Sequence, residues 1–207
     1  LADFADGLAR AAAARRATPD WQAARAVVEA KARQAAEINA RQAARAAAKA
    51  PTDDAEARTL AHQHRQLTRV IEADTADQAR LAAQQVTWTA AALEHYRRAL
   101  VAGGEYDLRA VARLVSVFLE AGPTDPAVVD AASPALVAVP SHKFVPLVYQ
   151  VASRLGGWGG GEGPSSTSSP AFGAAVARLM ARLATDHPHH TLWQLYALAN
   201  GGRGRGG

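Results

Sequence analysis

Between Thr18 and Pro51 the chain reads TPDWQAARAVVEAKARQAAEINARQAARAAAKAP. Thr18 can cap a helix, Pro19 suits the first helical position and Asp20 favours the positive helix end. No glycine or proline follows before Pro51, so the stretch predicts one helix of about 45 Å, at roughly 1.5 Å per residue. Its inward stripe is expected to hold Trp21, Val28, Ala32, Ala35 and Ile38. A stripe with so many small side chains requires a close partner helix.

The next segment supplies that partner. A helix is predicted over residues 54–101, with a break near Asp74 and Thr75 as an alternative. Asp53 and Glu56 match the spacing of a capping box. Its apolar residues keep helical spacing at Leu60, Leu67, Ile71, Leu81, Trp88, Ala92, Tyr96 and Leu100. A short turn between two long helices predicts an antiparallel hairpin, which Gly103 and Gly104 would close.

Shorter helices are expected on both sides of this hairpin. Alanine is the best helix former, valine and isoleucine are sparse, and no strand-like alternation lasts, so the chain is predicted to be all-α. The other predicted helices cover residues 2–15, 106–121, 126–132, 141–155, a segment beginning at 169–170, and 188–200. Pro134 and Pro140 would bracket a turn, and Pro146 would lie near the first turn of its helix. Inward stripes would include Leu108, Val111, Val115, Phe118 and Leu119, then Phe144, Leu147, Val148, Val151 and Leu155, then Phe172, Val176, Leu179, Met180 and Leu183.

The amino-acid composition limits the kinds of functional site that this chain can form. The 207 residues include no cysteine, which excludes disulfides and thiolate chemistry, and no apolar run is long enough to span a membrane. The net charge is +4 with both signs mixed along the chain, which indicates solvated helix faces more than a phosphate-binding face. The Gly/Ser-rich residues 156–169 are predicted to form a flexible insert, and residues 201–207 a disordered Gly/Arg tail.

The stretch Asp186–Asn200 reads DHPHHTLWQLYALAN and suggests a metal site. Histidine and carboxylate bind zinc, but His187, His189 and His190 lack the i, i+3 or i, i+4 spacing of ligands on a helix. The alternative is the start of a helix, where Asp186 caps, Pro188 fixes the turn and the imidazoles bond to nearby backbone. This alternative predicts no metal, and a buried helix carrying Leu192, Trp193, Leu195, Tyr196 and Leu198.

No residue set in the chain predicts catalysis or cofactor binding. Ser141, His142 and Ser153 are not in a G-x-S-x-G turn, and the glycines at 156–163 lack the P-loop lysine. Three signatures of protein kinases are absent: the Gly-rich loop with its lysine, the H-R-D motif and the D-F-G motif. The segment is therefore expected to be non-catalytic.

Three blocks carry a family resemblance. Leu1–Asp6 (LADFAD) resembles the start of a helix in the FAT region of ATM-type kinases. Val139–Arg154 (VPSHKFVPLVYQVASR) and Asp186–Asn200 resemble two further blocks of that region, in the same order and at similar spacing. The resemblance covers nearly the whole chain outside the insert and the tail. The matching positions include the structural-motif residues Lys143, Phe144, Pro146, Tyr149, Asp186, His187, Pro188, His189 and His190.

The resemblance is to the ATM branch of the phosphatidylinositol-3-kinase-related protein kinases. It implies that residues 1–200 are helical repeats, arranged as an α-solenoid of TPR- or HEAT-like hairpins, from the C-terminal part of a FAT domain. The implied parent is a nuclear serine/threonine kinase of the DNA double-strand-break response that uses ATP and Mg²⁺. The implied partners are adjoining repeats, the kinase domain of the same chain, and a second copy of the parent.

Two alternatives remain open at this level. The first is a stand-alone basic module that binds nucleic acid through its Arg-rich helices and Gly/Arg tail, although direct nucleic-acid binding is not the expectation from the mixed charges. The second is a zinc site at residues 187–190, which the ligand spacing disfavours.

Overall fold

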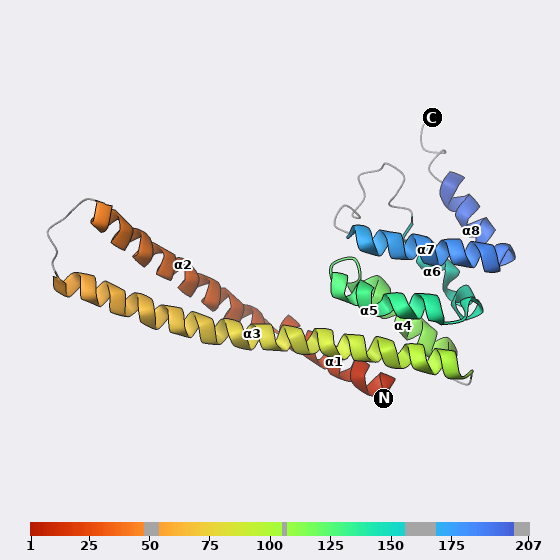
Figure 1. The fold of residues 1–207 in the computed structure, drawn as a ribbon, viewed down its shortest axis with the longest axis horizontal. Coiled ribbons are helices and arrows are strands. Elements are labelled where there is room, and N and C mark those ends of the chain that lie inside the picture. Colours follow the sequence, from red (N-terminus) through yellow and green to blue (C-terminus); the bar gives the residue numbers. More distant parts are fainter. Residues whose placement is uncertain (48–53, 105–106, 156–168, 201–207) are drawn as a thin grey trace. The chain divides into compact units, whose positions relative to one another are not determined.

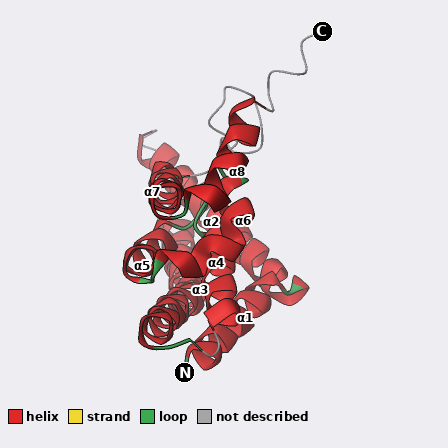
Figure 2. Ribbon diagram, turned by 90° about the vertical axis from the view of Figure 1, so that its right-hand side faces the viewer, coloured by secondary structure: helices red, strands yellow, loops and turns green. Residues whose placement is uncertain are grey.

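The computed structural model describes residues 1–47, 54–104, 107–155 and 169–200. Within these ranges the regular elements are all helical and no strand is present (Figure 2). This confirms the predicted all-α class, with helices stacked in a solenoid-like manner. None of the described helices combines the length and apolar character that crossing a bilayer requires.

The helices follow one another as Figure 1 labels them. Their bounds are α1 Ala2–Ala17, α2 Pro19–Ala47, α3 Asp54–Ala102, α4 Asp107–Ala121, α5 Pro126–Ala138, the 3-10 helix η1 Ser141–Leu147, α6 Val148–Ala152, α7 Pro170–Asp186 and α8 Pro188–Asn200. The chain forms two compact units. The stack unit comprises Leu1–Gly7 and Val86–Gly207, and the hairpin unit comprises Leu8–Gln85.

Three helices begin in the same way, with a capping side chain followed by proline. The cap accepts a hydrogen bond from the backbone three or two residues on, and proline occupies the first helical position, where its missing N–H costs least. The bonds run from Trp21 N to Thr18 Oγ1 (3.3 Å), from Ala127 N to Asp125 Oδ1 (3.0 Å) and from Phe172 N to Ser169 Oγ (3.2 Å). These helix starts are confirmed. The predicted capping box at residues 53–56, residues 156–168 of the predicted insert at 156–169, and the tail at 201–207 lie outside the described side chains.

In the hairpin unit, α2 runs alongside the first part of α3 (Figure 1). The half-buried or buried positions alternate in steps of three and four, which is the heptad spacing of a coiled coil. The series comprises residues 28, 31, 35, 38, 42 and 45 on α2, and 60, 64, 67, 71, 74, 78, 81 and 85 on α3, while residues 21, 61, 68 and 82 are half-buried outside it. The predicted hairpin is confirmed, α3 continues unbroken through Asp74 and Thr75, and Ala32 is exposed rather than inward.

The seam of this coiled coil is unusually polar. Lys31 Nζ donates to Asp74 Oδ2 at 3.0 Å in its middle, and Arg16 Nη1 donates to Gln85 Oε1 at 2.7 Å at one end. Only Ala35 and Ile38 of α2, with Ala9 and Ala12 of α1, are buried among the described residues of this unit, and each keeps 7–9% of its surface exposed. Polar pairs at seam positions specify register at some cost in stability.

The stack unit holds one continuous apolar core. It joins the last turns of α3 to α4, α5, η1, α6 and α7. Within it the ring centroids of Phe118 and Phe172 lie 5.0 Å apart, with the rings tilted by 42°. The inward stripes predicted for α4 and α7 are confirmed with one exception. Leu108 is 63% exposed, because the buried part of α4 begins one turn later, at Ala110 and Val111.

Two predictions around the prolines of this unit are wrong. Pro134 lies inside α5, which continues to Ala138, so the turn is confined to Val139–Pro140. The predicted helix 141–155 is instead η1 followed by the five residues of α6. Pro146 has no N–H to give an α-helical bond, and the tighter 3-10 winding of a short segment accommodates it. Phe144, Leu147, Val148 and Val151 are nevertheless buried as predicted.

Gly122 provides a test of how closely α4 and α7 pack. A Cβ atom at this position would lie 2.4 Å from the Phe118 carbonyl oxygen and 2.8 Å from Phe172 Cδ2. We expect Gly122→Ala to lower the unfolding free energy by about 1–3 kcal/mol, as overpacking does. Urea unfolding followed by circular dichroism measures the change.

Gly7 is the matched control. It lies inside α1, and an added Cβ would meet nothing within 4 Å. Gly7→Ala should stabilise the chain by up to about 1 kcal/mol through helix propensity. Equal destabilisation by the two substitutions would contradict the close approach at Gly122.

Candidate functional site

Lys143 is the best-connected of the residues that the sequence singled out. It lies on η1, and its ammonium reaches the end of α3 and the start of α4. Lys143 Nζ donates to the carbonyl oxygens of Leu100 (2.6 Å) and Gly103 (2.8 Å) and pairs with Asp107 Oδ2 at 2.7 Å. An ammonium has three donors, so this geometry uses all of them. The Lys143 side chain is only 10% exposed.

The chemistry of this contact is that of a helix cap. The last carbonyls of α3 have no partner within the helix and form its negative end, where a cation is favourable. Asp107 is the first residue of α4, where an anion is favourable for the opposite reason. One buried cation therefore closes the connection between the two helices, and residues 105–106 of that connection lie outside the described residues.

The other residues of the η1 block have separate roles. Phe144 is fully buried in the core, whereas Pro146 is exposed and Tyr149 is 70% exposed. Tyr149 lies beside Gln150 and Ser153 on the rim of a shallow groove of about 380 Å³ that α4 also lines. The block therefore anchors the core through Phe144 and presents Tyr149 outward.

The histidine block does not form a cluster of ligands. Among the described residues, no group of three or more His, Asp or Glu side chains is arranged to hold a metal ion. His187 is half-buried, whereas His189 and His190 are exposed. The predicted cap is wrong in detail: Asp186 is the last residue of α7 and lies 3.7 Å from Arg182 Nε, while Pro188 is the first residue of α8.

Sequence reasoning missed the partner of His187. Its Nε2 lies 3.0 Å from Ser141 Oγ, although 46 residues separate them. A Ser–His pair resembles a nucleophile and its base, but catalytic pairs require a third group that orients the imidazole. No such contact to His187 Nδ1 occurs among the described side chains. Instead, the His187 N–H donates to Leu183 O at 2.8 Å and its carbonyl accepts from Thr191 Oγ1 at 2.9 Å. The residue thus joins η1 to the α7–α8 turn.

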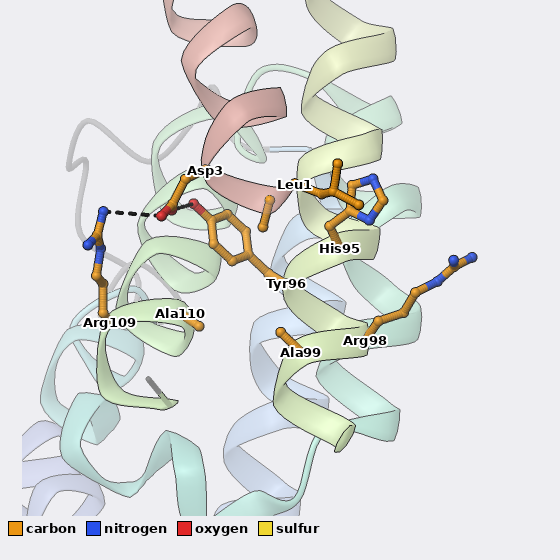
Figure 3. Close-up of a pocket in the computed structure, with 9 residues that line it drawn as sticks. Leu1, Asp3, His95, Tyr96, Arg98, Ala99, Arg109 and Ala110 are labelled. Carbon is orange, nitrogen blue, oxygen red and sulfur yellow. Dashed lines mark hydrogen bonds and ion pairs between the residues drawn. The ribbon is translucent and has the colours of Figure 1, made fainter. Parts of the chain in front are cut away.

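A second feature is an open groove of about 790 Å³ in the stack unit, between the start of α1, the end of α3 and the start of α4 (Figure 3). Leu1, Ala2, Ala99 and Ala110 contribute apolar surface, and His95, Arg98 and Arg109 contribute polar groups. Asp3 accepts from the Tyr96 hydroxyl at 3.0 Å and from Arg109 Nη2 at 3.2 Å, as the dashed line in Figure 3 marks for Arg109.

Charged groups next to the groove are paired. Asp6, 3% exposed, accepts two bonds from Arg113, at 2.8 Å from Nε and 3.0 Å from Nη2. The hydrogen bond to Asp6 raises the pKa of Arg113. Glu94 accepts from Arg97 and Arg98, and these bonds lower its pKa to about 2. The Asp6–Arg113 pair fixes α1 to α4, whereas the Glu94 pairs lie within α3.

Large apolar side chains are exposed on the first and last helices of the stack unit. The predicted buried character of α8 is wrong: Trp193 is 76% exposed, Tyr196 66%, Leu192 55% and Leu198 40%, and only Thr191 is fully buried. Near the groove, Leu1, Phe4, Val101 and Leu108 are each at least 50% exposed. Apolar side chains grouped on a surface indicate contact with another polypeptide. The helical pattern could not show this, because an amphipathic stripe is the same whether a partner lies in the chain or outside it.

The fold therefore defines an all-helical, solenoid-like segment. Sequence comparison identifies related proteins over about half of it. The chain is 43% identical over 112 residues to the serine/threonine-protein kinase ATM of Arabidopsis thaliana, which covers 54% of this chain and 3% of the relative. It is 34% identical over 110 residues to the serine-protein kinase ATM of Sus scrofa, covering 53% and 3%.

A fungal protein shows the same similarity. The chain is 35% identical over 75 residues to the serine/threonine-protein kinase tel1 of Emericella nidulans, which covers 36% of this chain and 2% of the relative. No family model matches the chain, and no solved structure matches it. The homologues of about half of the chain are thus ATM and Tel1 kinases, as expected of a segment of an ATM-type kinase. The chain spans about 3% of the length of the ATM relatives.

Replacing Lys143 tests the cap. Lys143→Met keeps the apolar stem but leaves the Leu100 and Gly103 carbonyls and Asp107 without their cation. We expect the unfolding free energy to fall by about 3 kcal/mol, since buried groups that lose a charged partner are costly. Urea unfolding measures it. Lys31→Met is the control: its pair is more exposed and should cost under about 1 kcal/mol.

The environment of Tyr96 predicts that the stability of the fold decreases at alkaline pH. Burial, together with the hydrogen bond to Asp3, raises the pKa of the Tyr96 hydroxyl. The folded state therefore holds the proton after the unfolded chain has lost it at a pKa of about 10. This contribution to stability is complete below pH 10 and decreases above it, by at most about 1.4 kcal/mol per pH unit.

Phenylalanine at position 96 removes this titration. Between pH 10 and 12 the stability of Tyr96→Phe should decline less steeply than that of the unsubstituted chain, measured by urea unfolding at each pH. Tyr149→Phe, at an exposed position, should leave the slope unchanged. The same slope in the chain and in Tyr96→Phe would contradict the assignment.

Proposed function

We propose that this chain is a helical scaffold segment from the C-terminal part of the FAT domain of an ATM-like serine/threonine kinase. The observation that carries the proposal is the exposed apolar face of α8, which is formed by Trp193, Tyr196 and Leu192. In this proposal α8 packs on the helices of an adjoining repeat or on the kinase domain of the same polypeptide.

The arrangement of the stack unit supports this role. α7 contacts α5, η1, α6 and α8, and its apolar side chains are covered. α8 contacts α6 and α7 and leaves its other face open. In a solenoid each repeat packs on its neighbours, so an open apolar face is a surface on which a further repeat would pack. The exposed Leu1, Phe4 and Leu108 near α1 and α4 are a second surface of the same kind.

The proposed activity belongs to the parent protein. The similarity to ATM and tel1 kinases supports a parent that phosphorylates serine or threonine with ATP and Mg²⁺. The FAT resemblance adds a nuclear location, a role in the response to DNA double-strand breaks and a homodimeric parent. Within this segment the proposal assigns no catalytic, cofactor or metal-binding residue; Lys143 and His187 hold the helices that present α8.

The surface of α8 can be tested directly. The double variant Trp193→Glu/Tyr196→Glu places two charges on the exposed face without removing a core side chain. We expect it to weaken binding to a recombinant kinase domain of the Arabidopsis thaliana relative at least tenfold, measured by isothermal titration calorimetry. Buried apolar anchors of this type dominate interface energies.

The control carries the same charge change elsewhere. Val27 and Val137 are 51% and 74% exposed on α2 and α5, and Val27→Glu/Val137→Glu should bind as the unsubstituted chain does. Equal loss in both double variants, or no binding of the kinase domain by the unsubstituted chain, would argue against a docking role for α8. A gene that encodes no Gly-rich loop and D-F-G motif beyond Gly207 would contradict the kinase parent.

A further inference from the structure

The net charge of the chain is concentrated in the hairpin unit. This unit, Leu8–Gln85, contains 13 of the 23 basic and 9 of the 19 acidic residues, so it carries the whole net charge of +4. The charges that look mixed along the sequence are therefore not evenly distributed over the fold.

The charges are also segregated along the hairpin. We call residues 38–45 of α2 and 57–71 of α3 the outer arm. It holds five arginines and no acid, whereas residues 19–37 and 72–85 hold four basic and six acidic residues. The residues between the two parts of the arm add one lysine and three acids, so residues 38–71 together carry six basic and three acidic residues.

One face of α3 aligns the charges of the outer arm. Arg58, His62, Arg65 and Arg69 follow the spacing i, i+4, i+7 and i+11, which places them within about 60° of one another on a helix, over about 16 Å. All four side chains are exposed. Among the described residues, Arg65 and Arg69 form no ion pair, and Arg65 donates only to the carbonyl of Ala61, at 3.3 Å.

The surface of the outer arm lacks what a protein partner would need. Val70, 43% exposed, is its single large apolar side chain on the surface among the described residues. Protein interfaces normally have an apolar centre, and isolated surface ion pairs contribute little. Phosphate differs, because the arginine fork matches its oxygens and because a polyphosphate releases counterions when it is neutralised.

The absence of large aromatic side chains from the arm indicates which form of nucleic acid it would suit. Residues 38–71 contain no Phe, Trp or Tyr. Single strands are generally held by bases stacked on aromatic side chains, so a surface without Phe, Trp or Tyr fits the backbone of a duplex better. A straight row of cations along one helix also suits a regular phosphate backbone, which has one phosphate per about 3.4 Å of duplex axis on each strand.

We propose that the outer arm of the α2–α3 hairpin is an electrostatic docking surface for the phosphate backbone of a nucleic-acid duplex, with Arg58, Arg65 and Arg69 as its principal contacts. The contact is independent of base sequence, because the arm presents charge and no group that reads base edges. The inference does not rest on the scaffold proposed for α8, which is in the other unit.

The test uses the full 207-residue chain and a fluorescent 30-base-pair DNA duplex of arbitrary sequence, followed by anisotropy between 50 and 200 mM salt. The variant Arg58→Gln/Arg65→Gln/Arg69→Gln keeps helix propensity. It should weaken binding at 50 mM salt at least tenfold, and should reduce the slope of log affinity against log salt by about 3, since each phosphate contact contributes about 0.9.

The matched control is Arg25→Gln/Arg33→Gln/Arg80→Gln, which removes the same charge from the hairpin at positions of α2 and α3 outside the arm. It should retain most of the affinity. Circular dichroism confirms that both triple variants stay folded. A second probe, fluorescent polyglutamate of similar net charge, separates a nucleic acid from an acidic polypeptide.

Three results would overturn the proposal. They are the absence of duplex binding at 50 mM salt, the same loss in both triple variants, and tighter binding of polyglutamate than of the duplex. The last would assign the arm to an acidic protein segment. Failure of α8 to bind a kinase domain would leave these outcomes unchanged, so the two proposals can fail separately.

Discussion

The contact between the Lys143 ammonium and the end of α3 holds the stack unit together. α3 ends and α4 begins at this contact. The backbone groups at a helix end have no hydrogen-bond partner within their own helix and need one from elsewhere. One cation from η1, forty residues later, satisfies both carbonyls and the carboxylate of Asp107. Since η1 also inserts Phe144 into the core, the same seven residues seal the surface turn and fill the interior.

Much of this architecture could be predicted from local sequence. The caps at Thr18, Asp125 and Ser169 act within three residues of themselves, and the stripes of α4 and α7 repeat with the period of the helix, so both are visible without the fold. The antiparallel hairpin was predictable from two long helices joined by a short turn, although the α2 stripe included the exposed Ala32. The polar contacts between α2 and α3 were less evident. From sequence alone Lys31 and Asp74 resemble solvent-exposed charges, and only the structure shows that they pair across the hairpin.

The sequence-based predictions are wrong where the local structure depends on contacts with residues far away in the sequence. Pro134 is a breaker by local rules, yet α5 has enough buried neighbours to continue through it. Ser141 and His187 are 46 residues apart and give no joint signal. The prediction that α8 is buried was wrong, because an apolar stripe does not indicate whether the helix packs within the chain or on another polypeptide. The roles of Lys143 and Arg113 are likewise invisible in sequence, since each needs an acceptor placed by tertiary structure.

The single helix α3 belongs to two different packing environments. Its first part faces α2 across a seam of half-exposed side chains, while its last turns bury Leu93, Tyr96 and Leu100 almost completely. A turn of helix opens more readily where it buries less apolar surface. Backbone amides of one continuous helix should therefore exchange with solvent deuterium at rates that decrease toward its C-terminal end. Turns in the first part of α3 can open and re-form while the core around Leu93 and Leu100 stays closed.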